Sequence, residues 1–233
     1  MNAVITGASK GIGRAIALKL AQEGYNLALC ARSLTDLKSL QSDLLQISPN
    51  ANIYIEALDC ADLPALHSFA KQAQAKLGFV DVLINNVGQY LPGTILEEAD
   101  DALALQMQTN VYPAYTLSKF FGKEMRTRKS GYIINICSIA SLNVVKEAAS
   151  YSVTKVALLG LTTILREELQ SSGVKVSAIL PGATYTSSWE GTPIAPEKFI
   201  QPEDVAQAVW TCLSLSPGAT IDQLILNPIS KAF

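Results

Sequence analysis

Short apolar runs alternate with longer amphipathic stretches along the whole chain. The runs are typical of strands buried on both faces, and the stretches between them carry apolar positions at helical spacing. The expected strands span residues 3–5, 27–30, 53–55, 80–84, 132–136, 174–180 and 223–226. The expected helices lie near residues 12–24, 34–47, 62–77, 99–126, 149–172 and 202–214. This alternation predicts a doubly wound α/β fold with about seven parallel strands, right-handed crossovers and helices on both faces.

One segment interrupts this regular pattern. Residues 183–200 are rich in Thr, Ser, Pro and Gly and show no clear periodicity. In a compact domain a loop of this length usually binds a ligand or covers a site. Because the length of 233 residues fits a single α/β domain, we expect one domain over residues 1–233 with a substrate loop near 183–200.

Composition and charge exclude several classes of partner. The chain is 49% hydrophobic and 16% charged, which suits a sheet covered on both faces. Its net charge is −2 with scattered Lys and Arg, so neither nucleic acid nor an anionic membrane is an expected partner. No apolar run has the length of a membrane span, and a strand begins almost at once, which leaves no room for a signal peptide. The expected location is the cytoplasm.

The cysteines do not suggest a metal site. Cys30, Cys60, Cys137 and Cys212 lie far apart without a CxxC motif, and His67 is the single histidine. A zinc site or a disulfide framework is therefore not expected. We interpret the four residues as small hydrophobic side chains in or near strands.

A glycine-rich turn, TGASKGIG, joins the first strand to the first helix over residues 6–13. Gly7 permits a sharp turn, Gly11 keeps side chains away from a pyrophosphate, and Gly13 permits close packing of helix on strand. The helix N-terminus then offers free N–H groups to phosphates. The alternative is an ordinary turn between strand and helix. Its place at the first strand favours a Rossmann-type dinucleotide site.

The end of the second strand indicates which dinucleotide binds. NAD sites carry an acidic residue there, but in this sequence Ala31 takes that place and Arg32 follows it. A guanidinium can bond a 2′-phosphate in a fork, and Lys10 adds a second positive charge. We therefore expect NADP(H) rather than NAD(H). Alternatively, Arg32 is a solvated residue that stacks on adenine.

Ser138, Tyr151 and Lys155 form a candidate catalytic group. Ser138 follows the fifth strand, and Tyr151 and Lys155 share one face of a helix at i and i+4. An adjacent ammonium lowers the pKa of a phenol, so Tyr151 can exchange a proton with a substrate oxygen that Ser138 orients. A Tyr-x-x-x-Lys pair alone is common on helix surfaces, and its position after Ser138 is what favours catalysis.

These motifs resemble the short-chain dehydrogenase/reductase family, in particular its NADP-preferring, 3-oxoacyl reductase-like members. The family carries Thr-Gly-x-x-x-Gly-x-Gly, then Asn-Asn-Ala-Gly, matched here by residues 85–88 with Val87 in place of Ala. The resemblance implies that Asn110 holds a water in a proton relay. Pro113 independently predicts a kink near Asn110. The implied cofactor contacts are Gly7, Ser9, Lys10, Gly11, Ile12, Arg32, Ser33, Asp59, Asn86, Gly88, Tyr151, Lys155, Pro181, Gly182, Thr184 and Thr186.

Some of these implied contacts have alternatives. In similar proteins Asp59 accepts a hydrogen bond from the adenine amino group, but it also suits a helix cap before Leu63. Of Thr184 and Thr186, the latter has the more usual spacing for binding the nicotinamide amide. Asn110 can equally be an ordinary polar helix residue.

The predicted activity is hydride transfer between NADP(H) and a ketone, aldehyde or secondary alcohol of small to medium size. The alternatives are a non-catalytic NADP(H) sensor and an extended-type epimerase, which usually needs a longer chain.

A homodimer or homotetramer is expected, with helices 99–126 and 149–172 across a dimer interface as in similar proteins. The expected pocket comprises Gln89, Tyr90, Leu142, Val145, Tyr185 and Trp189, with Lys146 and Glu147 near its mouth. Trp189 can instead pack the loop shut.

Overall fold

All seven predicted strands are present in the computed structural model, which describes residues 1–143, 145–189 and 191–229. They are β1 (Asn2–Thr6), β2 (Asn26–Ala31), β3 (Ile53–Ala57), β4 (Val82–Asn85), β5 (Tyr132–Ile136), β6 (Lys175–Pro181) and β7 (Gln223–Leu226). Every pairing between them is parallel, in the order β3-β2-β1-β4-β5-β6-β7. The predicted doubly wound Rossmann fold is confirmed, and its order reverses between β1 and β4, where such sheets bind ligands at their carboxyl edge.

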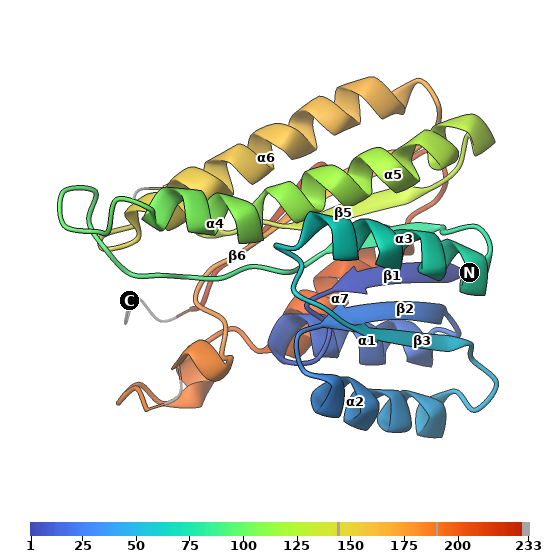
Figure 1. Ribbon diagram of the computed structural model, residues 1–233, viewed down its shortest axis with the longest axis horizontal. Coiled ribbons are helices and arrows are strands. Elements are labelled where there is room, and N and C mark those ends of the chain that lie inside the picture. The colour runs from blue at the N-terminus through green and yellow to red at the C-terminus, as the bar shows by residue number, and fades with distance from the viewer. Residues whose placement is uncertain (144, 190, 230–233) are drawn as a thin grey trace.

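Helices cover both faces of the sheet (Figure 1). The longer ones are α1 (Gly11–Gln22), α2 (Leu34–Ile47), α3 (Leu63–Leu77), α4 (Ala102–Asn110), α5 (Tyr112–Arg128), α6 (Ala149–Gln170) and α7 (Pro202–Leu213). Helix α1 packs between α2 and α7 on one face, while α5 contacts α3, α4 and α6 on the other. The two layers explain why the central strands read as continuous apolar runs.

The prediction of a single helix over residues 99–126 is wrong, because the structure contains two helices there. Helix α4 ends at Asn110, Val111 leaves helical geometry at φ −120°, and α5 begins at Tyr112. Pro113 lies in the first turn of α5, where its missing N–H costs no hydrogen bond. The predicted kink therefore occurs, one residue beyond the expected position, as a break that leaves Asn110 at the end of a helix.

The core has buried apolar clusters on both sides of the sheet. Val4 packs with Leu83 and Phe69, whereas its neighbour Ile5 packs with Ile16 on the opposite face. Successive strand residues point to opposite faces, so both must be apolar.

All four cysteines are buried free thiols, as small hydrophobic side chains would be. Cys30 lies in β2, while Cys60 and Cys137 follow the ends of β3 and β5. Cys212 lies in α7, but its buried thiol faces Tyr132 of β5 and Ser177 of β6, so it too is near strands.

The loop near 183–200 contains two short 3-10 helices, η2 (Ser187–Trp189) and η3 (Pro196–Lys198), and its two ends are hydrogen-bonded to each other. Tyr185 N–H donates to Ile200 O at 2.8 Å, and Ile200 N–H donates to Ala183 O at 3.0 Å. The rings of Tyr185 and Trp189 both pack on Phe199. The alternative interpretation of Trp189, packing within the loop, is the one that the structure favours. No helix in the described ranges is long and apolar enough to cross a membrane.

Candidate active site

The glycine-rich turn forms a tight cradle at the carboxyl end of β1. Gly7 and Gly11 have φ values of +63° and +51°, in the region that favours glycine. A Cβ added to Gly13 would lie 2.3 Å from Gly7 O, so a side chain there would force the turn open. The Asn86 amide donates to Thr6 O and Gly7 O at 2.9 and 3.1 Å and fixes the same turn from β4. The predicted roles of the three glycines fit this geometry.

Two further members of the turn, Ser9 and Ile12, are both half-buried. Ile12 packs against the core from the first turn of α1. Backbone groups and not large side chains therefore face the space at the α1 N-terminus, where a helix attracts phosphate.

A basic edge follows β2. Ala31 is buried at the strand end, and the Arg32 side chain is exposed. Ser33 caps α2 by accepting a hydrogen bond from Asp36 N–H at 3.2 Å. Lys10 lies 3.1 Å from the Asp36 carboxylate and, with the Ser33 contact, lowers the pKa of Asp36. Arg32 and Lys10 thus lie at one edge, but Lys10 already has an acidic partner.

Asp59 does not cap α3. Its carboxylate accepts from Ala61 N–H at 2.9 Å, whereas Asp62 accepts from Ala65 N–H at 3.1 Å at the start of the helix. The alternative interpretation of Asp59 as a helix cap is wrong, because α3 begins four residues beyond it and Asp62 is its N-cap. The Asp59 side chain is exposed after β3.

Lys155 joins β5 to Tyr151. Its side chain is 4% exposed, and its ammonium donates to Ile136 O at 3.0 Å, at the end of β5. The same Nζ lies 5.6 Å from the centre of the Tyr151 ring. Ser138, two residues after Ile136, accepts a hydrogen bond from Ala140 N–H at 3.1 Å. Ser138, Tyr151 and Lys155 are therefore assembled around the carboxyl end of one strand.

Asn110 ties two segments to this group. Its Oδ1 accepts from Gln89 N–H at 2.7 Å, and its Nδ2 donates to Gln89 O and Thr154 Oγ1, both at 3.0 Å. Thr154 in turn donates to Tyr151 O at 2.7 Å. A Cβ added to Gly88 would lie 3.4 Å from Lys155 Nζ, so this glycine borders the ammonium. Both groups of the Asn110 side-chain amide thus hold neighbouring segments in place.

Thr154 was not predicted from the sequence. It is fully buried between Asn110 and Tyr151. A hydroxyl three residues after Tyr151 can bond back to a helix carbonyl, and this spacing is the signal that identifies it. The common Ser/Thr content of helices makes that signal weak by itself.

The segment after β6 places its two threonines differently. Thr184 is buried and donates to Gly182 O at 3.0 Å. The Thr186 methyl group would lie 3.0 Å from a Cβ on Gly11, so Thr186 borders the glycine-rich turn. Pro181 ends β6 and leads the chain into this region. Thr186 is therefore the threonine closer to the expected pyrophosphate position.

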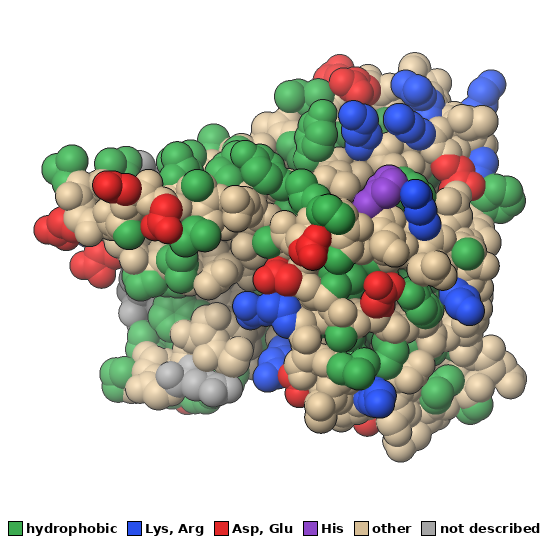
Figure 2. Space-filling model, viewed as in Figure 1, with side chains coloured by type: hydrophobic (Ala, Val, Ile, Leu, Met, Phe, Trp, Pro, Cys, Tyr) green, Lys and Arg blue, Asp and Glu red, His purple; other side chains and the backbone are tan. Residues whose placement is uncertain are grey.

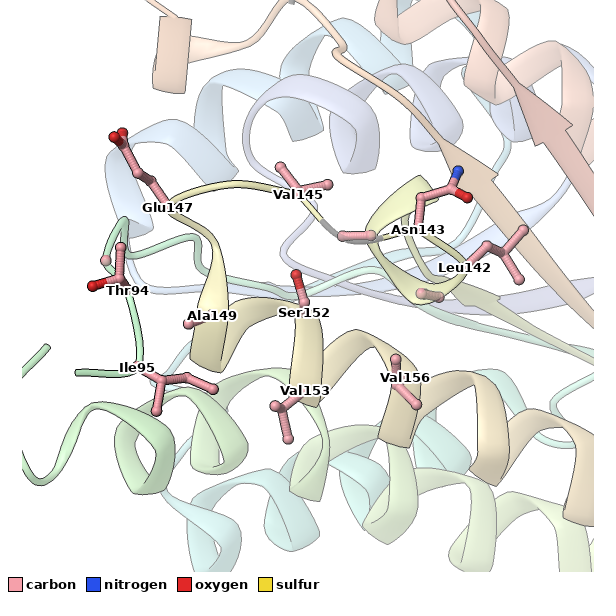
Figure 3. A pocket seen from close by; sticks show the side chains of 13 residues that line it. Thr94, Ile95, Leu142, Asn143, Val145, Glu147, Ala149, Ser152, Val153 and Val156 are labelled. Atoms are coloured by element: carbon pink, nitrogen blue, oxygen red, sulfur yellow. The ribbon is translucent and has the colours of Figure 1, made fainter. Parts of the chain in front are cut away.

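An apolar groove of about 590 Å³ is lined by residues 140–142, which follow Ser138, and by Ser152, next to Tyr151, but not by Ser138, Tyr151 or Lys155 themselves. Figure 3 shows it between α6, with Ser152 and Val156, and the loop that carries Leu142 and Val145. Of the expected pocket, Leu142, Val145 and Glu147 line this groove. Gln89, Tyr90, Tyr185 and Trp189 do not, because the first two face Asn110 and Tyr151 and the others pack around Phe199.

Comparisons with known proteins agree with this geometry. The family model for short chain dehydrogenases matches residues 1–194. An uncharacterized oxidoreductase of Staphylococcus aureus (strain MRSA252) is 31% identical over 97% of this chain and 96% of its own.

Two solved structures share the fold over nearly their whole length. An alcohol dehydrogenase from the archaeon Thermococcus sibiricus, complexed with 5-hydroxy-NADP, is 28% identical with a TM-score of 0.89, covering 98% of this chain and 96% of its own. L-sorbose reductase from Gluconobacter frateurii, complexed with NADPH and L-sorbose, is 28% identical with a TM-score of 0.89, covering 97% and 95%. The glycine-rich turn, the Ser138, Tyr151 and Lys155 group and the family match lead to one conclusion: this chain belongs to the short-chain dehydrogenase/reductase family of oxidoreductases.

Proposed function

We propose that this protein transfers hydride between NADP(H) and a ketone, aldehyde or secondary alcohol of small to medium size. The observation that carries the proposal is the buried Lys155 ammonium, held by Ile136 O and lying beside the Tyr151 ring. A buried cation is costly unless it is paired or has a function. Here its position next to a tyrosine and a strand-end serine suits proton exchange with a substrate oxygen.

The residues at the carboxyl edge fit a dinucleotide. Gly13 and Gly7 form a cradle that a Cβ would fill, and the α1 N-terminus faces the same space. When bound, the nicotinamide cofactor supplies or accepts the hydride. Arg32 is exposed where a 2′-phosphate would lie, and no acidic residue replaces Ala31. Solved relatives in complex with NADP or NADPH support this choice of cofactor.

The proposed role of each catalytic side chain follows from its hydrogen bonds. The Ser138 oxygen accepts from Ala140 N–H, so its own proton can be donated to a substrate oxygen. Tyr151 gives or takes the proton at that oxygen. The Lys155 ammonium lies beside the Tyr151 ring and would reach the ribose of a bound cofactor past Gly88, where the absence of a side chain leaves room. Asn110 positions the segment at Gln89 and the Tyr151 turn of α6.

The first test is the Tyr151→Phe variant. NADPH oxidation is followed by absorbance with a panel of ethyl acetoacetate, cyclohexanone and benzaldehyde. We expect kcat to fall at least about a hundredfold, because general acid catalysis typically contributes 10²- to 10⁴-fold. NADPH binding, measured by fluorescence titration, should remain within about threefold. Near-normal turnover in this variant would exclude the proposed mechanism.

The choice of cofactor is tested at Arg32. Arg32→Ala should weaken NADPH binding by about tenfold or more and leave NADH binding nearly unchanged, because charge-assisted hydrogen bonds to a phosphate contribute about 1.5–3 kcal/mol. Lys38→Ala, which removes an exposed charge from α2, is the matched control. Equal affinity of the wild-type protein for NADPH and NADH would contradict the assignment of Arg32.

We infer further that the chain forms a homodimer or homotetramer through α5 and α6. Several large apolar side chains on these helices are exposed, namely Tyr112, Tyr115, Val153, Val156 and Ile164. Figure 2 shows hydrophobic side chains over the upper left and centre of this side, whereas Lys and Arg side chains gather at its upper right end. Gly160 has no atom within 4 Å of an added Cβ, so a second helix could approach closely there.

A further inference from the structure

We propose that Tyr90 is a positioning residue for Tyr151 that holds the phenol ring at the angle needed for proton transfer. The inference rests on the proposed function of Tyr151. The two rings lie with centres 5.2 Å apart and planes at 88°, so the edge of one ring meets the face of the other. Aromatic pairs favour this arrangement because the positive edge of one ring contacts the negative face of its neighbour.

Two groups contact the Tyr151 ring, one of them buried and the other exposed. The Lys155 ammonium lies 5.6 Å from the Tyr151 ring centre, and Tyr90 lies 5.2 Å from it. Lys155 is fixed by Ile136 O and belongs to the sheet side of the site. Tyr90 is 46% exposed and belongs to the solvent side. Without Tyr90, the outer side of the Tyr151 ring would lose this contact and could turn away from the substrate oxygen.

Tyr90 itself is fixed at its hydroxyl. The hydroxyl donates to Glu147 O at 3.0 Å. That carbonyl also accepts from Gly93 N–H at 2.9 Å, and Glu147 has φ +55°, which directs its backbone differently from a helix or strand. Burial, together with the charge of Glu147, raises the pKa of Tyr90, so its hydroxyl stays protonated and continues to donate.

The backbone before Tyr90 is fixed as well. Gln89 is bonded by Asn110 at both its N–H and its carbonyl, so the residue before Tyr90 cannot shift easily. On the other side, Ala149 N–H donates to Gly93 O at 3.1 Å and ties the segment to the start of α6. The segment over residues 89–93 thus spans from Asn110 to the N-terminus of the catalytic helix, with the Tyr90 ring against Tyr151.

The orientation of the Tyr151 ring affects the rate of proton transfer. Proton transfer requires heavy atoms within hydrogen-bond reach, and a displacement of about 1 Å can lower a rate by about a hundredfold. A ring that turns freely spends less time in the reactive position. Tyr90 therefore affects the step that moves the proton, and not the binding of NADP(H) at the glycine-rich turn.

The test compares Tyr90→Ala with Tyr90→Phe, using the carbonyl compound of the panel that the wild-type protein reduces fastest. Tyr90→Ala should lower kcat by about tenfold or more and increase the solvent deuterium isotope effect on kcat, because proton transfer becomes slower. The NADPH dissociation constant and the midpoint of thermal unfolding should stay close to wild type. Tyr90→Phe keeps the ring contact but loses the hydrogen bond to Glu147 O, so its kcat should lie between those of Tyr90→Ala and the wild type.

The matched control is Leu96→Ala, which truncates a side chain that is 95% exposed in the same connecting segment. It should leave kcat and the isotope effect unchanged. In the contrary outcome, Tyr90→Ala lowers kcat, NADPH affinity and thermal stability together and leaves the isotope effect unchanged. That result would assign Tyr90 a purely structural role and overturn the inference. An active wild type with an equally active Tyr90→Ala variant overturns this inference alone. A wild-type protein inactive on every carbonyl overturns the proposed function and the inference together.

Discussion

Cys137 and Ser138 are adjacent in the chain, but only the serine has the surroundings of a reactive group. Burial raises the pKa of the Cys137 thiol to about 11, although the nearby Lys155 ammonium opposes the shift. A thiol reacts as its thiolate, and this residue stays protonated at neutral pH. The chemistry proposed at the end of β5 therefore uses the Ser138 hydroxyl, whose oxygen is held by Ala140 N–H.

The raised pKa of Cys137 predicts a loss of stability at alkaline pH. The unfolded thiol ionises near pH 9 and the folded thiol near pH 11, so the unfolded state loses its proton first as the pH rises. Stability is fully present below pH 9 and falls between about pH 9 and 11, with about 1.4 kcal/mol of the free energy of unfolding lost by pH 10. Urea unfolding at pH 8 and pH 10 measures this difference.

The variant that isolates this thiol is Cys137→Ala, which should show a smaller difference in unfolding free energy between pH 8 and pH 10 than wild type. Leu158→Ala is the control, because Leu158 belongs to the same buried cluster but carries no titrating group. It should lower stability equally at both pH values. An unchanged pH difference in Cys137→Ala would show that other buried groups cause the loss.

At the scale of elements, the junction of β1 with α1 depends on Gly13. A Cβ there would meet Gly7 O at 2.3 Å and Asn86 Nδ2 at 2.5 Å, and the first of these is backbone that cannot move alone. We expect Gly13→Ala to lower the free energy of unfolding by about 1–3 kcal/mol and to weaken NADPH binding, because the turn must open. Gly218→Ala is the control, since a Cβ added there meets no atom within 4 Å. Unfolding by urea and fluorescence titration with NADPH measure both effects.

Most elements could be predicted from the sequence because their signals are local. Apolar runs located all seven strands, and helical spacing located the helices to within a few residues. The order of the strands was not predictable in this way, since it depends on which runs pair across the sheet. The division at Val111 was only partly predictable: Pro113 indicates a bend, but its place in the first turn of α5 depends on how both helices pack.

In the candidate site, too, local features were predictable from the sequence and contacts between distant residues were not. The spacing of Tyr151 and Lys155 on one helix face is a local property and was predictable. The contact of Tyr90 with Tyr151 joins residues that are far apart in the chain, so no local pattern indicates it. Asp59 and Asp62 show that local sequence can also be ambiguous. Both residue types suit a helix cap, and only the observed start of α3 identifies Asp62 as the cap.

For the whole molecule, the exposed apolar side of α5 and α6 predicts association of two copies. Val156 is 54% exposed near Gly160, where a partner helix would come closest. A carboxylate buried in such an interface costs several kcal/mol, so Val156→Glu should weaken association by at least about a hundredfold. Leu45→Glu makes the same change of charge at an exposed leucine of α2, on the other side of the sheet, and should leave association unchanged. Sedimentation equilibrium at micromolar concentration distinguishes the outcomes: a monomeric wild type, or a Val156→Glu variant that remains fully dimeric, would show that this face is not the interface.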